Sequence, residues 1–294
     1  MPAGPDWQRD GADWPNREAS RFVAASGVSW HVQTMGQGPV LLLVHGTGAS
    51  THSWRDLMPL LARQFTVIAP DLPGHGFTSR AHGDGMSLAG MSRLVGELLI
   101  ALGARPEFAV GHSAGAAILA RMALDRRIAL RRLVSVNGAF LPFAGVLRIF
   151  SPAAKFLAST SVAAHITAVR ARDPAAVARL LASTGSSIDA RGRALYARLV
   201  RSPGHVAGAL AMMASWDLDA MPRDLRRLDV PMLLIAGSND RTIAPAQADR
   251  VAVLVPHGLV ERLAGLGHLA HEERPALVCE RIAAFFDEAS SAGG

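Results

Sequence analysis

Short apolar runs recur along this chain and alternate with segments of helical spacing. Residues 40–44 form a continuous apolar run that ends at a His-Gly pair, which is typical of a strand buried on both faces of a parallel sheet. Residues 20–25 and 28–34 flank Gly27 and predict a hairpin. Further strands are predicted at residues 66–69, 107–111, 133–136, 231–236 and 259–263, and helices near residues 53–63, 87–102, 114–125, 245–254 and 273–288. This alternation predicts an α/β fold with right-handed crossovers and a mostly parallel central sheet flanked by helices.

The alternation stops between residues 139 and 222, where the pattern predicts helices only. An all-helical insertion between two strands, here after the sixth strand, is expected to form a cap. We therefore predict an α/β core made of residues 1–138 and 223–294, and a helical cap at 139–222. Residues 1–19 are a polar leader, which we expect either to pack irregularly on the core or to be partly disordered.

Composition limits the location and the partners of the protein. Half of the 294 residues are hydrophobic, which is enough for a large core, and the net charge of +6 comes from arginines spread along the chain. We therefore expect no nucleic-acid partner, although a mildly basic surface is compatible with an acidic partner or an anionic membrane. Without a visible signal peptide or a run of ~18 apolar residues, we predict a cytoplasmic protein that can touch the inner membrane peripherally. Cys279 is the sole cysteine, so we expect no internal disulfide and a buried, inert thiol.

Residues 111–115, Gly-His-Ser-Ala-Gly, match the G-x-S-x-G nucleophile elbow. On its own this motif is unspecific in a glycine-rich chain. Here it lies between a predicted buried strand and a predicted alanine-rich helix, the context in which a sharp turn lifts the serine hydroxyl above the sheet. We predict that Ser113 is a nucleophile.

A serine hydroxyl needs a base to become a nucleophile, and the base needs an acid to orient it. One known chain order of such groups is Ser, then Asp or Glu, then His. Asp240 directly follows a predicted buried strand, and His268 lies in the loop after the last predicted strand. We predict that His268 takes the proton of Ser113 and later donates it to the leaving group, while Asp240 fixes the imidazole tautomer.

Other residues compete for these roles. Asp240 also fits the N-cap of a helix. Asp249 and Asp229 are rival acids, but neither ends a predicted strand. Asn137 ends the preceding predicted strand, where an acid would also fit, but an amide is a poorer choice. His271 is a rival base, which we expect to enter the last helix.

The negative charge that develops on the substrate oxygen needs preorganised N–H donors. We predict the backbone N–H of Ala114 as one donor and that of Thr47, in the His-Gly-Thr-Gly loop, as the other. Gly46 and Gly48 also fit an ordinary turn, and we expect His45 to brace the loop.

No cofactor or metal site is expected. The Gly-Thr-Gly segment at residues 46–48 lacks the Gly-Lys-Ser/Thr of a phosphate loop, and residues 268–272 lack the His-Glu-x-x-His order of a zinc protease helix. We expect the cap histidines His165 and His205 to be structural.

The elbow, the loop at 45–48, residues 71–76 and the segments that carry Asp240 and His268 together resemble an α/β-hydrolase over nearly the whole chain. Haloalkane dehalogenases and epoxide hydrolases carry Asp at the position of Ser113, so the serine argues against these two classes of hydrolase. A narrower resemblance is to the BchO-type magnesium-chelatase accessory proteins of bacteriochlorophyll synthesis. It rests on residues 13–20 (DWPNREAS), 45–55 (HGTGASTHSWR), 111–122 (GHSAGAAILARM) and 265–273 (GLGHLAHEE). The first stretch is the most specific, and the resemblance implies a role in tetrapyrrole biosynthesis in a photosynthetic bacterium.

Apolar side chains in the predicted cap indicate an apolar pocket over Ser113, although helical spacing also fits the core of the cap. The predicted substrate-binding residues are Phe140, Phe143, Met212 and Trp216, with Phe150, Phe156 and Met213 nearby. Arg148, Arg170 and Arg172 fit either a substrate carboxylate, such as a porphyrin propionate, or a solvated helix face, and we favour the solvated face. Residues 138–150 are apolar enough to touch a membrane surface, but packing on the core is favoured.

Three functions fit the sequence. The first is a serine hydrolase that acts on an ester of a bulky apolar small molecule, with a tetrapyrrole among the candidates. The second is a non-catalytic protein that binds a porphyrin or contacts magnesium chelatase transiently, because a fold does not fix function. The third is cofactor-free dioxygenase, haloperoxidase or C–C hydrolase chemistry on the same three residues.

Overall fold

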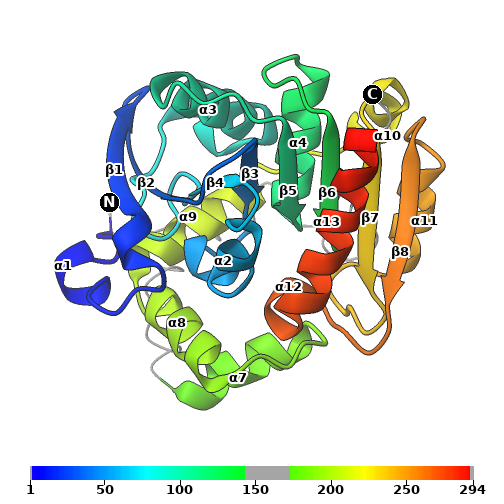
Figure 1. Ribbon diagram of the computed structural model, residues 1–294. Coiled ribbons are helices and arrows are strands. Elements are labelled where there is room, and N and C mark those ends of the chain that lie inside the picture. Colours follow the sequence, from blue (N-terminus) through cyan, green and yellow to red (C-terminus); the bar gives the residue numbers. More distant parts are fainter. Residues whose placement is uncertain (1, 143–172, 292–294) are drawn as a thin grey trace.

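The computed structural model describes residues 2–142 and 173–291. Predictions for Phe143, Phe150, Phe156, Arg148, His165, Arg170 and Arg172 lie outside the described residues. The described chain forms an eight-stranded sheet of order β1-β2-β4-β3-β5-β6-β7-β8 (Figure 1). The strands are β1 Ser20–Ala25, β2 Val28–Met35, β3 Val40–Val44, β4 Thr66–Pro70, β5 Phe108–His112, β6 Arg132–Val136, β7 Met232–Gly237 and β8 Gly258–Leu263.

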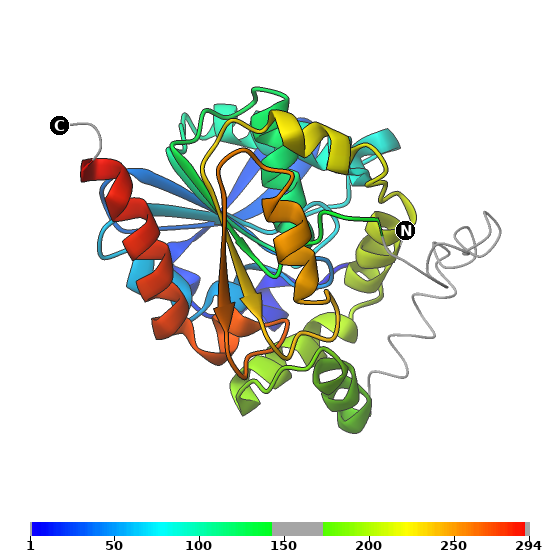
Figure 2. The same cartoon turned by 90° about the vertical axis from the view of Figure 1, so that its right-hand side faces the viewer.

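The sheet is mostly parallel, as the sequence predicts. Only β1–β2 and β2–β4 pair antiparallel, and the pairs from β4–β3 to β7–β8 are parallel. Successive strand residues face opposite sides, so Leu42 and Val44 pack in one core cluster with α3 and α4, while Leu41 and Leu43 pack in another with α2 and α13. Figure 2 shows α13 and α4 on opposite sides of the sheet.

Local hydrogen bonds and a proline set two of the boundaries of the helices that cover the sheet. The helices are α1 Trp7–Asp10, α2 Leu57–Leu61, α3 Leu88–Ala101, α4 Ala114–Leu124, α11 Ala246–Ala252, α12 Ala270–Glu273 and α13 Pro275–Ser291, with 3-10 turns η1 Arg17–Ala19, η2 Thr51–Trp54 and η3 Gly83–Met86. The predicted helix near 53–63 is wrong in its first turn, because the hydroxyl and N–H of Ser53 both bond the Ser50 carbonyl and close η2 instead. The predicted helix at 273–288 is split at Arg274, whose φ of −139° follows from the steric demand of the next residue, Pro275.

Between β6 and β7 the described residues contain helices and turns. They are α7 Pro174–Ser183, α8 Ala190–Val200, α9 Pro203–Ala214, α10 Met221–Asp224 and η5 Leu225–Arg227. In Figure 1, α7 and α8 lie beyond the ends of β7 and β8 toward which the arrows point, the carboxyl edge of the sheet. Parallel α/β sheets bind their ligands at this edge. The cap boundaries at 139 and 222 remain a prediction.

The leader is packed rather than disordered over its described part. Trp14 is buried and donates its indole N–H to Thr51 Oγ1 at 3.1 Å. Arg198 of α8 pairs with Asp13 at 2.5 Å, so the leader joins α8 to the core.

Two further expectations concern Cys279 and the membrane. Cys279 is half-buried rather than fully buried, and burial raises the pKa of its thiol.

Among the helices of the described ranges, none has the length and apolarity needed to cross a bilayer.

Candidate active site

Ser113 stands on a strained turn between β5 and α4. Its backbone has φ 51° and ψ −118°, a region that residues with a side chain rarely adopt. A bond of 3.0 Å from the Ser113 N–H to the Val136 carbonyl holds the turn. A Cβ on Gly115 would lie 2.0 Å from the Val44 carbonyl oxygen, so only glycine lets α4 approach the sheet this closely. Ser113 is partly exposed while both of its chain neighbours are buried, so the turn lifts its side chain out of the core.

Asp240 and His268 meet at the carboxyl edge of the sheet. Asp240 Oδ2 lies 2.8 Å from His268 Nδ1, and the side chains are 1% and 8% exposed. Asp240 Oδ1 accepts the N–H groups of Thr242 and Ile243 at 2.7 and 2.9 Å. One carboxylate oxygen therefore caps the turn after β7 while the other faces the imidazole. A proton on Nδ1 directed at Asp240 leaves Nε2 free to act as a base.

Asn137 and His112 hold the histidine loop. Asn137 Nδ2 donates to the carbonyls of Gly267 and His268 at 3.0 and 2.9 Å, and its Oδ1 accepts the Gly237 N–H at 2.8 Å. His112 Nε2 donates to the same His268 carbonyl at 2.9 Å, and the two imidazole rings lie 4.7 Å apart. The sequence marks Asn137 only as a poor substitute for an acid, and His112 fills a variable position of the elbow motif. No pattern in the sequence indicates that Asn137 and His112 hold the histidine loop.

The rival residues lie in other surroundings. His271 is fully buried in α12, with its ring 4.5 Å from that of His112, and burial lowers its pKa to about 3. Asp249 pairs with Arg262 on the surface, and Asp229 is exposed. The structure therefore brings Asp240, rather than Asp249 or Asp229, to His268.

His45 orients the peptide unit that carries the Thr47 N–H. His45 Nδ1 donates to the Gly46 carbonyl at 2.8 Å, and its Nε2 accepts the Leu72 N–H at 2.9 Å. Burial lowers the pKa of His45, which favours the neutral tautomer that these two bonds require. Because the Gly46 carbonyl and the Thr47 N–H belong to one planar unit, the bond from His45 restrains the direction of this N–H.

The loop after β3 passes close to Ser113. A Cβ on Gly46 would lie 2.9 Å from Ser113 Cβ. Ala114 is the first residue of α4, and the N–H groups of a first helical turn have no partner inside the helix. Gly46, the residue before Thr47, therefore lies next to Ser113 in space, and Ala114 follows Ser113 in the chain. That the N–H groups of Thr47 and Ala114 bind an oxyanion remains a prediction.

Of the predicted pocket residues that the structure describes, Met212 belongs to α9, Trp216 follows it, and Phe140 follows β6. Phe140 and Met212 are fully buried in the cluster that also contains α3 and α4, and Trp216 packs partly buried against it. The Thr47 hydroxyl donates to Met212 Sδ at 3.4 Å, which places Met212 beside the predicted oxyanion loop. A substrate contact of these side chains remains a prediction.

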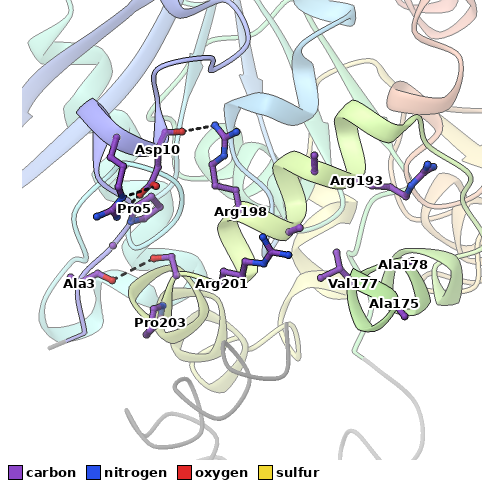
Figure 3. Close-up of a pocket in the computed structure, with 15 residues that line it drawn as sticks. Ala3, Pro5, Asp10, Ala175, Val177, Ala178, Arg193, Arg198, Arg201 and Pro203 are labelled. Carbon is purple, nitrogen blue, oxygen red and sulfur yellow. Dashed lines mark hydrogen bonds and ion pairs between the residues drawn. The ribbon is translucent and has the colours of Figure 1, made fainter. Parts of the chain in front are cut away.

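A cavity of about 990 Å³ lies elsewhere, between the leader and α7–α9 (Figure 3). Alanines and arginines dominate its lining, and none of the residues predicted for catalysis takes part. Arg198 donates to the Asp10 carbonyl there at 2.6 Å, and Arg193 bonds the Ile188 carbonyl. This cavity is separate from Ser113.

A further histidine–aspartate pair lies under the leader, and a serine hydroxyl lies at hydrogen-bond distance from its histidine. His31 Nδ1 lies 2.8 Å from Asp71 Oδ2, and His31 Nε2 lies 3.0 Å from Ser20 Oγ. Asp71 also accepts the N–H groups of Thr51 and Phe77 at 2.6 and 2.9 Å. Burial works to raise the pKa of Asp71, but His31 and the hydrogen bonds lower it overall. The sequence gives no indication of this cluster.

Comparisons with known proteins agree on the family. The profile of the alpha/beta hydrolase fold matches residues 39–275. The magnesium-chelatase 30 kDa subunit of Rhodobacter capsulatus is 38% identical over 264 residues, which cover 89% of this chain and 92% of that protein. Pyrrolizixenacetamide deacetylase of Xenorhabdus hominickii is 30% identical over 256 residues, which cover 82% of this chain and 88% of that protein.

Solved structures agree on the fold. An alpha/beta hydrolase fold protein from Burkholderia ambifaria superposes with a TM-score of 0.75 at 23% identity, covering 98% of this chain and all of that one. An esterase from Thermogutta terrifontis superposes with a TM-score of 0.72 at 20% identity, covering 92% of this chain and 98% of that one. The family resemblance of the sequence is thereby confirmed: the chain belongs to the alpha/beta hydrolase fold family.

Proposed function

We propose that this protein is a serine hydrolase that cleaves an ester of a bulky apolar molecule. The observation that carries the proposal is the Asp240–His268 pair, 2.8 Å between Oδ2 and Nδ1, at the edge of the sheet where Ser113 stands on its strained turn. A preorganised base that can reach a serine hydroxyl is the requirement for nucleophilic acyl transfer, and Ser113 is partly exposed at this edge.

The reaction follows from the acid–base roles. Ser113 Oγ attacks the ester carbonyl carbon while its proton passes to His268 Nε2, and Asp240 stabilises the imidazolium. The N–H groups of Thr47 and Ala114 stabilise the tetrahedral oxyanion. His268 then protonates the leaving alcohol as the C–O bond breaks. In the second half, His268 activates water, which attacks the acyl carbon and releases the acid and Ser113.

The substrate class rests on the cap. Phe140, Phe143, Met212 and Trp216 would form an apolar pocket, and apolar walls with few polar groups suit large hydrophobic ligands. The relative named as a deacetylase supports acyl chemistry. The relative named as a magnesium-chelatase subunit makes a tetrapyrrole ester the first substrate to try, in a cytoplasmic protein with peripheral contact to the inner membrane.

An active-site fluorophosphonate tests the hydrolase proposal. The wild-type protein should be labelled at Ser113, as read by mass spectrometry of the modified peptide, and Ser113→Ala should abolish that adduct. A folded wild-type protein that takes up no label would refute the proposal.

A second candidate function is a binding role without turnover, in which the protein holds a porphyrin or contacts magnesium chelatase. The identity of 38% over most of both chains to the chelatase-named relative favours it. Complementation decides between the two. If Ser113→Ala restores pigment synthesis in a deletion strain as fully as wild type does, the binding role is correct; if it fails at normal protein level, catalysis is required.

A further inference from the structure

The imidazole of His205, in the cap helix α9, joins two loops of the core. Its Nδ1 accepts the Gly76 N–H at 3.0 Å, and its Nε2 lies 3.1 Å from the Gly48 carbonyl oxygen. A backbone N–H can only donate and a carbonyl can only accept, so Nε2 carries the proton and Nδ1 does not. His205 is 2% exposed, and burial lowers its pKa to about 4, which keeps this neutral tautomer at neutral pH.

One of the two loops carries the predicted oxyanion donor. Thr47 lies between Gly46, whose carbonyl accepts from His45 Nδ1, and Gly48, whose carbonyl accepts from His205 Nε2. His45 of the core therefore holds the peptide unit that precedes Thr47. His205 of the cap helix holds the carbonyl of Gly48, the residue that follows Thr47. The direction of the Thr47 N–H depends on both.

The surrounding face of α9 leaves little freedom for this contact. His205, Gly208 and Met212 lie on one side of the helix, at a spacing of three and then four residues. A Cβ on Gly208 would lie 1.9 Å from the Gly74 carbonyl oxygen, so the helix backbone rests directly on the loop that follows β4. Met212 accepts from the Thr47 hydroxyl at 3.4 Å. We therefore expect a shift of α9 to move Gly48 and Thr47 together.

We propose that His205 is a positioning residue for the oxyanion loop, which transmits the position of α9 to the Thr47 N–H. The proposal rests on the hydrolase function proposed above. Oxyanion donors act mainly on the transition state, so losing the Gly48 contact lowers kcat and leaves KM nearly unchanged. A contact that merely docks the cap would change KM and stability instead.

Two amide variants separate the two bonds of His205. The amide of His205→Gln reaches the position of Nε2 and keeps a donor for the Gly48 carbonyl. The amide of His205→Asn reaches only the position of Nδ1 and keeps an acceptor for the Gly76 N–H. Each variant retains one bond and loses the other, so each serves as the stability control of the other.

The measurements are the rate of fluorophosphonate labelling of Ser113, kcat and KM for a p-nitrophenyl ester, and the melting temperature. We expect His205→Asn to lower the labelling rate and kcat by roughly ten- to a hundred-fold, and His205→Gln to stay within about threefold of wild type. The two melting temperatures should be similar.

Three outcomes would overturn the proposal. The first is that both variants label at the wild-type rate. The second is that both lose rate equally with raised KM and lower melting temperature, which assigns His205 to cap docking alone. A wild-type protein that is neither labelled nor active would instead refute the hydrolase function, and the positioning role with it.

Discussion

Two clusters in this molecule, Asp240–His268 with the proposed nucleophile Ser113 and Asp71–His31 with Ser20, share the geometry of the histidine–aspartate pair. The Nδ1–Oδ2 distance is 2.8 Å both in the His268–Asp240 pair and in the His31–Asp71 pair. In the second cluster the serine hydroxyl even lies 3.0 Å from the histidine Nε2. Judged by these side chains alone, Ser20 would be as good a nucleophile as Ser113.

The surroundings of the two serines differ. Ser20 has ordinary extended backbone, with φ −84° and ψ 138°, whereas Ser113 has φ 51° and precedes the N-terminus of α4. The Ser20 hydroxyl also accepts from Gln33 Nε2 at 3.2 Å. The rings of Trp7, Phe22 and Phe77 enclose His31 at 4.9 to 5.4 Å. The backbone around the serine and the nearby N–H donors, more than the three side chains, therefore distinguish a proposed catalytic site from a structural cluster.

Replacing each serine is the most direct way to break this comparison. Ser113→Ala should lower ester hydrolysis by about ten-thousand-fold to a millionfold, because nothing else can form the acyl intermediate. Ser20→Ala should change the rate by less than about threefold, since Ser20 stands on ordinary extended backbone away from the proposed oxyanion donors. Initial rates with a p-nitrophenyl ester measure both. A fluorophosphonate adduct on Ser20 in the Ser113→Ala protein would show that the second cluster is also reactive.

The two aspartates should separate rate from stability. Asp240→Asn should lower kcat by about ten-thousand-fold, because the amide favours the wrong tautomer of His268. Its melting temperature should change little, since Asn Oδ1 still accepts the N–H groups of Thr242 and Ile243. Asp71→Asn should leave kcat nearly unchanged but lower the free energy of unfolding by about 1–3 kcal/mol, because a buried donor loses its acceptor.

Paired kinetics and thermal unfolding test this separation. A strong rate loss in folded Asp71→Asn would assign the second cluster a part in the reaction. An unchanged rate in Asp240→Asn would remove Asp240 from the catalytic set.

The sequence predicts what local pattern determines. The sheet, the elbow and the Asp240 and His268 positions follow from apolar runs and from polar residues that directly end them. The role of Asn137 does not, because its partners Gly237 and Gly267 are backbone groups 100 and 130 residues away. The same holds for His31, whose acceptor Asp71 lies 40 residues on. Such contacts depend on how the fold brings distant loops together, which no periodicity encodes.

Acid should unfold the protein through histidines that are buried without charge. Burial lowers the pKa values of His45, His52, His75, His112, His205 and His271, the last two to about 4 and about 3. Unfolding restores a value near 6.5, so the unfolded chain binds more protons below that pH. Stability should therefore be retained above pH 6.5 and lost as the pH falls toward 4, whereas the contribution of Asp71 is lost only below about pH 3.8.

Urea unfolding at several pH values measures this loss. One histidine such as His271 should account for about 2 kcal/mol between pH 6.5 and 5. His271→Gln should flatten the pH dependence by about that amount, and exposed His82→Gln should leave it unchanged. Equal slopes in the two variants would mean that His271 is charged in the folded protein.

The smallest expected effect concerns the turn between α7 and α8, which contacts the Asp240–His268 cluster and not the Asp71–His31 cluster. The Thr184 carbonyl accepts the N–H groups of both Arg241 and His268 at 3.1 and 3.3 Å, and Ser186 Oγ accepts the Leu269 N–H at 2.8 Å. The turn between α7 and α8 therefore bonds the residue after Asp240 as well as the histidine loop. We therefore expect this turn to help set the spacing of the Asp240–His268 pair.

Ser186→Ala should lower kcat by roughly three- to tenfold, because one neutral hydrogen bond is worth about 1 kcal/mol. Ser183→Ala is the matched control, since its exposed hydroxyl donates to the Leu180 carbonyl within α7 at 2.7 Å. The contact between His31 and Asp71 involves no residue of this turn, so the stability effect of Asp71→Asn should be the same with or without Ser186→Ala. If Ser186→Ala and Ser183→Ala have equal kcat, the Ser186 hydrogen bond to Leu269 does not position His268.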